Sequence, residues 1–158
     1  MSLQLKDLTI NTSELDTSKL MEYWSWLTGG MKEVLFISRM GDLFYQKQDG
    51  HIYWLATDYG KIFKVAESAH QFNELLQDEC NLDNWFLPSL ISELTQAGKH
   101  LTNSQVYSFN LLPLMGGEYD IANIEPTDVS VHFALTGQIC EQIKGLPDGT
   151  RVKLTITH

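Results

Sequence analysis

The chain has 158 residues, 43% of them hydrophobic, which is the size and composition of one domain that buries its own core. Its formal charge of −9 argues against nucleic acid as a direct ligand, because phosphate backbones attract basic surfaces. Two isolated cysteines, Cys80 and Cys140, exclude a disulfide framework or a zinc module and indicate a reducing cytoplasm. The sequence shows neither a signal-peptide pattern nor an apolar run of about 18 residues, so we expect no membrane partner.

The first predicted elements are a helix and a series of strands. Apolar residues spaced by three and four predict an amphipathic helix that begins at Thr17 or Ser18 and ends at Gly29-Gly30. Short segments rich in β-branched and aromatic residues follow, separated by turns that contain Gly and Asp, and they predict an antiparallel meander. Its four strands are expected at 34–38, 43–46, 52–56 and 61–65.

Helices are predicted next. Ser68 is a typical N-cap for a helix that places Phe72 on its apolar face, and a second helical stretch runs from Trp85 to Leu94 and closes near Gly98.

The last third of the chain is predicted to alternate between both kinds of element. A short strand is expected at 106–109, and the Pro- and Gly-containing segment 111–123 is expected to be a loop. A broad apolar stripe predicts a last helix from Thr127-Asp128, and alternation over 152–156 predicts a final strand with one buried face. The predicted fold class is α+β, an antiparallel sheet flanked by helices, in one domain over 1–158.

The acidic residues gather in one half of the chain. Between Val65 and Ile143 there are eleven acids and one base, Lys99, whereas the other nine acids and ten bases nearly cancel. Such asymmetry favours an acidic face for a basic partner. The alternative is a solvated surface that serves solubility alone.

Catalytic chemistry has one candidate. His132 follows Asp128 by four residues on the predicted last helix, a spacing at which the two form either a metal-ligand pair or a general acid–base dyad. The alternative is that Asp128 caps the helix while His132 packs at the edge of the core. No serine or cysteine stands in a nucleophile motif, and Gly116-Gly117 lacks a phosphate-loop pattern, so we expect no enzyme, cofactor or metal site.

Aromatic residues support a second hypothesis. Tyr53, Trp54 and Tyr119, together with the predicted loop 111–123, are candidates to line a pocket for an unknown small molecule. Packing across the sheet is the alternative role for Tyr53 and Trp54.

Three stretches of sequence resemble a bacterial family. They are Gly41-Asp42-Leu43-Phe44 with Ile52-Tyr53-Trp54-Leu55; Tyr107-Ser108-Phe109 leading through Pro113 to Gly116-Gly117-Glu118-Tyr119; and Val131-His132 with Gly137-Gln138-Ile139 and Leu146-Pro147-Asp148-Gly149-Thr150. Together they resemble the immunity proteins of type VI secretion DNase effectors. That family combines a GAD-like region, here 24–72, with a characteristic C-terminal region, here 101–152.

The resemblance implies an immunity protein that binds a cognate toxin, often a nuclease, in the cytoplasm and blocks it without catalysis. The acidic excess agrees, because a nuclease surface that attracts phosphate is basic. The resemblance assigns no toxin contacts, so the partner-binding candidates are chosen from the base-poor half and its aromatic residues. They are Glu74, Asp78, Glu79, Asp83, Trp85, Glu118, Tyr119, Asp120 and Glu125.

Overall fold

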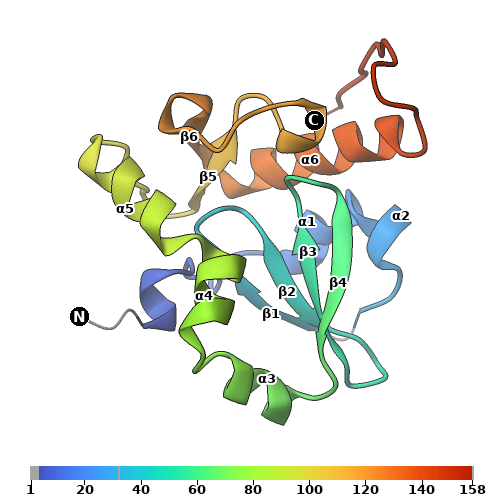
Figure 1. Ribbon diagram of the computed structural model, residues 1–158. Helices are drawn as coiled ribbons and strands as arrows, with labels where there is room; N and C mark the ends of the chain where they lie inside the picture. Colours follow the sequence, from blue (N-terminus) through green and yellow to red (C-terminus); the bar gives the residue numbers. More distant parts are fainter. Residues whose placement is uncertain (1–3, 32, 158) are drawn as a thin grey trace.

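The computed structural model describes residues 4–31 and 33–157 and confirms the α+β class (Figure 1). Its main sheet is an antiparallel meander in the order β1-β2-β3-β4, as predicted. The strands are β1 (Glu33–Ile37), β2 (Leu43–Gln46), β3 (Ile52–Ala56) and β4 (Lys61–Ala66).

Both faces of this sheet are buried. Side chains alternate along β2, so Phe44 enters one hydrophobic cluster while Leu43 and Tyr45 enter another on the opposite face. All three are fully buried. The helices therefore cover the sheet on both sides, and each face has its own core.

The face that carries Phe44 is covered by α3 (Ala69–Leu75), α4 (Glu79–Phe86) and α5 (Pro88–Gln96). Ser68 caps α3 as predicted, and its Oγ accepts from the Gln71 amide at 3.1 Å. The predicted second stretch is in fact two helices, because Leu87 adopts a left-handed conformation and Pro88 begins α5. A proline ring disfavours helical geometry at the preceding residue, which accounts for the break.

The opposite face is covered by α1 (Thr17–Glu22), α2 (Ser25–Thr28) and α6 (Val129–Ile143). The single helix predicted to run from residue 17 to Gly29-Gly30 is therefore wrong, since Trp24 leaves the helical conformation and is fully buried. The corner between α1 and α2 lies directly against α6. A Cβ at Gly137 would lie 2.4 Å from the Tyr23 carbonyl oxygen, so this approach requires glycine.

A second antiparallel pair joins β5 (Gln105–Phe109) to β6 (Ile124–Asp128). The sequence analysis missed β6, because Glu, Pro and Asp are poor strand formers. Pro126 pairs with Tyr107, and proline is tolerated there because β6 is an edge strand. The predicted loop between the two strands holds two short 3-10 helices, η2 (Pro113–Met115) and η3 (Ile121–Asn123).

The predicted final strand at 152–156 is wrong, because this segment has no strand partner in the described chain. It is extended and lies along α6, where two glutamine side chains replace the missing strand. Gln142 exchanges two hydrogen bonds with the backbone of Thr155, at 2.7 and 2.9 Å, and Gln138 does the same with Thr157, at 2.8 and 2.7 Å. The backbone of this segment is therefore held by side chains of a helix instead of by a neighbouring strand, and of its alternating apolar residues Leu154 and Ile156 are half-buried while Val152 is exposed.

Candidate functional site

Four of the predicted partner-binding acids lie on two consecutive helices. We call Glu74, Asp78, Glu79 and Asp83 the acidic group; all four are exposed. Glu74 is on α3, and Asp78 caps α4 by accepting from the Cys80 amide at 2.8 Å. Glu79 and Asp83 follow one turn apart on α4.

The members of the acidic group differ in whether their carboxylates already bind another group of the protein. Glu74 lies 3.0 Å from His70 Nε2, and Asp78 serves the helix end. Among the described residues, neither Glu79 nor Asp83 has an ion-pair partner. Like charges four residues apart on a helix repel each other by a few tenths of a kcal/mol, so a cationic partner would relieve this pair.

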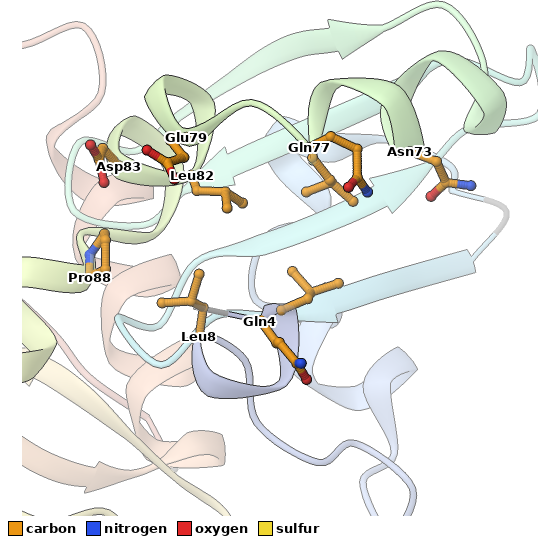
Figure 2. A pocket seen from close by; sticks show the side chains of 10 residues that line it. Gln4, Leu8, Asn73, Gln77, Glu79, Leu82, Asp83 and Pro88 are labelled. Carbon is orange, nitrogen blue, oxygen red and sulfur yellow. The ribbon is translucent and has the colours of Figure 1, made fainter. Parts of the chain in front are cut away.

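A groove of about 710 Å³ lies beside Glu79 and Asp83, between α3–α4 and a short 3-10 helix, η1 (Leu5–Asp7), near the start of the chain. We call it the η1 groove. Its floor is apolar, and no Lys or Arg is among the described residues that line it. Figure 2 shows Glu79 and Asp83 near Pro88 at one end and the amides of Gln77 and Asn73 toward the other. By its floor we mean the apolar residues among those that line the groove: Leu5, Leu8, Leu76, Leu82 and Pro88.

The sequence analysis missed the η1 side of the groove. Leu5 and Leu8 are three residues apart, a spacing that would have indicated a helical turn with one apolar face. That signal says nothing about where the turn lies. Its position against α4 follows from the tertiary fold.

The other acidic candidates lie at a distance from α3. Glu118, Tyr119 and Asp120 are in the connection between β5 and β6, which Figure 1 places at the opposite end of the molecule from α3. Asp120 caps η3, and Glu125 on β6 pairs with Lys99 at 2.8 Å. The exposed predicted residues therefore form two separate groups, one on α3 and α4 and the other in the β5–β6 connection and on β6.

Tyr119 is exposed and belongs to this second group. Its hydroxyl donates to Asp58, and its ring meets Phe109 edge to face at 5.1 Å. It is therefore held in place by two contacts while part of its surface stays in solvent.

Trp85 is placed differently from the sequence prediction. It was a candidate aromatic anchor, but its side chain is only 7% exposed and belongs to the core on the α3–α5 face. Its ring centroid lies 5.8 Å from those of Phe44 and Phe72. This location supports a packing role and leaves Tyr119 as the exposed aromatic candidate.

His132 lies in the interior, where α6 meets the sheet. Its side chain is buried, with Nε2 2.8 Å from the Gly41 carbonyl oxygen and 3.1 Å from Thr57 Oγ1. Nδ1 lies 2.7 Å from Ser108 Oγ. The carbonyl can only accept, so Nε2 carries the proton and Ser108 donates to Nδ1. Asp128 caps α6, accepting from the Ser130 and Val131 amides, as the alternative interpretation expected.

This arrangement is structural in character. His132 joins α6 to β5 and to the two turns that contain Gly41 and Thr57, and none of the four described cavities includes it. The Thr57 hydroxyl connects His132 to Asp42, because Thr57 Oγ1 also lies 3.1 Å from Asp42 Oδ1. Burial lowers the pKa of His132 to about 4, so the ring is neutral near pH 7.

We expect this histidine to make the fold acid-sensitive. Its pKa is about 4 in the fold and about 6.5 in its ordinary range, so between these values the unfolded chain binds the additional proton. The stabilisation is complete above pH 6.5 and is lost as pH falls towards 4. It is worth about 3 kcal/mol, at about 1.4 kcal/mol per pKa unit. Urea unfolding at pH 7 and pH 4.5 measures it.

The control is His132→Gln, which keeps an amide near the same partners but does not titrate. Burial raises the pKa of Asp42, which acts in the opposite direction, but Asp42 is present in both proteins and cancels in the comparison. An equal loss of stability in both proteins on acidification would contradict the assignment.

Among the described residues, the aromatic side chains of the second hypothesis pack in other ways than around a pocket. Trp54 lies between Phe44 and Phe63 and donates to Asp42 at 3.1 Å, while Tyr53 stacks on Tyr45. None of the four described cavities is lined by Tyr53, Trp54 or Tyr119.

Within 4–31 and 33–157, no group of three or more His, Cys, Asp or Glu side chains is placed to hold a metal ion. No helix in these ranges is long and apolar enough to cross a membrane.

Comparison with protein families finds one match. Residues 66–140 match the model of the C-terminal domain of the type VI secretion immunity protein Tdi1. The matched segment runs from the end of β4 into α6 and contains every predicted partner-binding residue. The chain therefore resembles type VI secretion immunity proteins, and the match supports an immunity role. A search of curated proteins finds no significant match.

Among solved structures, the fold is similar to the crystal structure of Atu4351 from Agrobacterium tumefaciens, with a TM-score of 0.51 and 16% sequence identity. The alignment covers 77% of this chain and 63% of that one, so this chain spans less than two thirds of the length of that structure. At this level of identity the similarity concerns the fold.

Proposed function

We propose that this chain is an immunity protein that binds a cognate, basic toxin of the nuclease type in the cytoplasm and neutralises it without chemistry of its own. The observation that carries the proposal is the family match over 66–140. It is supported by the acidic excess, because the matched segment includes ten acids and one base, Lys99. A nuclease must attract phosphate, so an acidic inhibitor gains association rate and complementarity against it.

The predicted contact residues enter this proposal in two groups. We assign the toxin contact to the acidic group on α3–α4, with Glu118, Tyr119, Asp120 and Glu125 as a secondary surface. Glu79 and Asp83 are the primary candidates, because their carboxylates have no ion-pair partner among the described residues. Asp120 already caps η3 and Glu125 already pairs with Lys99, so we expect both to contribute less to the binding of a partner.

Co-expression tests the proposal. The protein encoded beside this gene is expressed in a bacterial host with this chain, with an empty vector, or with an unrelated acidic protein of similar size and charge. We expect survival and co-purification of the two proteins only with this chain, and slower association at higher salt because the attraction is electrostatic. Equal survival with the unrelated acidic protein would show that charge alone protects. Death of the host with no complex would contradict an immunity role.

A further inference from the structure

The η1 groove combines two properties that the acidic group alone lacks. Its floor includes Leu5, Leu76 and Leu82, which are half-buried. Leu5 belongs to η1, Leu76 directly follows α3 and Leu82 is on α4. A partner that covers half-buried leucines in a concave surface is bound more tightly, because removing apolar surface from water is favourable.

Charge is placed at one end of this apolar floor. Glu79 and Asp83 lie one turn apart on α4 near Pro88, and both are exposed. The other end carries the neutral amides of Asn73 and Gln77, which can donate to and accept from a peptide backbone. The groove is therefore polarised along its length, with cation-attracting oxygens at one end and backbone-binding amides at the other.

We infer that the η1 groove holds one segment of the cognate toxin, in which neighbouring apolar side chains are followed by Arg or Lys. The apolar side chains cover the leucines, and the cation lies between the carboxylates of Glu79 and Asp83. The volume of about 710 Å³ is large enough for several side chains. This inference rests on the proposed immunity function and names the site and the chemistry through which the toxin is bound.

Charge complementarity selects this occupant. An acidic segment would meet two carboxylates, with no Lys or Arg among the described lining residues to offset them. A purely apolar segment would leave the repulsion between Glu79 and Asp83 unrelieved. A segment that is both apolar and basic satisfies the floor and the acidic end together.

The test compares two single charge reversals in the full chain. Asp83→Lys places the change in the groove, and Glu141→Lys makes the same change at an exposed carboxylate on α6 that is not among the proposed contact residues. Affinity for the protein encoded by the adjacent gene is measured by surface plasmon resonance. Melting temperatures are measured first to confirm that both variants fold. We expect Asp83→Lys to weaken binding by about 30-fold or more, and Glu141→Lys by less than about threefold.

A second variant and a second readout separate the floor from the charges. Leu82→Ala keeps the charge and is expected to weaken binding about tenfold. Hydrogen exchange on the wild-type complex is expected to slow in 4–8 and 69–88, the segments that line the groove. Asp83→Asn, a smaller change than reversal, is used if the lysine variant does not fold.

The outcomes are distinguishable. If the wild-type chain binds and protects but Asp83→Lys, Asp83→Asn and Leu82→Ala all bind equally well, the groove is not the site and the immunity function stands. If Glu141→Lys causes the larger loss, the contact surface lies away from the groove and the groove inference is overturned. If the wild-type chain binds nothing, the immunity function and the groove occupant fail together.

Discussion

Replacing Gly41 with alanine is expected to lower the free energy of unfolding by about 4 kcal/mol. Gly41 has a φ of +81°, and a Cβ there would lie 2.4 Å from His132 Nε2. The substitution therefore strains the backbone, and it also places the new methyl group against the buried, hydrogen-bonded ring of His132. His132 would have to give up its 2.8 Å hydrogen bond to the Gly41 carbonyl oxygen. Urea unfolding at pH 7 measures the effect.

Gly50→Ala is the matched control. Gly50 has a similar φ of +87°, but its Cβ would meet nothing within 4 Å. Its expected cost is the backbone strain alone, about 1–2 kcal/mol. The difference between the two variants isolates the contact with His132. Equal costs at both positions would mean that the histidine moves aside freely.

Trp85→Ala is expected to destabilise the fold by about 3–5 kcal/mol, because it removes a ring that packs against both Phe44 and Phe72 in the α3–α5 core. Survival in the toxin co-expression assay should fall in proportion to the loss of folded protein. At low temperature, where the folded fraction recovers, the affinity for the toxin should return to near the wild-type value. Thermal melting and binding at two temperatures separate these effects.

Phe63→Ala provides a comparison at an aromatic residue that is 45% exposed and contacts Trp54 at 5.3 Å between ring centroids. We expect it to cost less than about 1.5 kcal/mol. A Trp85→Ala protein with unchanged melting temperature and much weaker toxin binding would restore Trp85 as a contact residue.

The part of the fold that could be predicted is the part determined by neighbouring residues. The meander was evident because Gly41, Gly50 and Gly60 each supply the positive φ of a turn between strands of alternating apolar residues. The Ser68 cap is likewise a local signal.

The errors arise where tertiary contacts override local pattern. β6 contains Glu125 and Pro126, which are weak strand formers, and it forms because β5 supplies a hydrogen-bonding edge. The final segment has the alternation of a strand, but its backbone forms hydrogen bonds with the side chains of Gln138 and Gln142 on α6 instead of with a neighbouring strand. The break at Pro88 was visible in the sequence and should have divided the predicted second helical stretch.

The candidate site was predicted in part for the same reason. The uneven distribution of charge along the chain indicated the acidic residues of α3 and α4, because acids and bases can be counted from the sequence without a structure. The groove could not be predicted, because its opposite wall comes from residues 4–8, far away in sequence. The separation of Glu118 and Asp120 from α3, and the burial of Trp85, also depend on the three-dimensional arrangement.

The coverage of one sheet face by α6 has a consequence for synthesis of the protein. The strands that carry Leu43, Tyr45 and Leu55 are made long before Phe133 and Cys140, which cover them. While the chain is on the ribosome, this apolar face stays open to water and to other chains until α6 emerges. Nascent or truncated chains that lack α6 therefore expose a surface prone to aggregation, and we expect them to depend on chaperones.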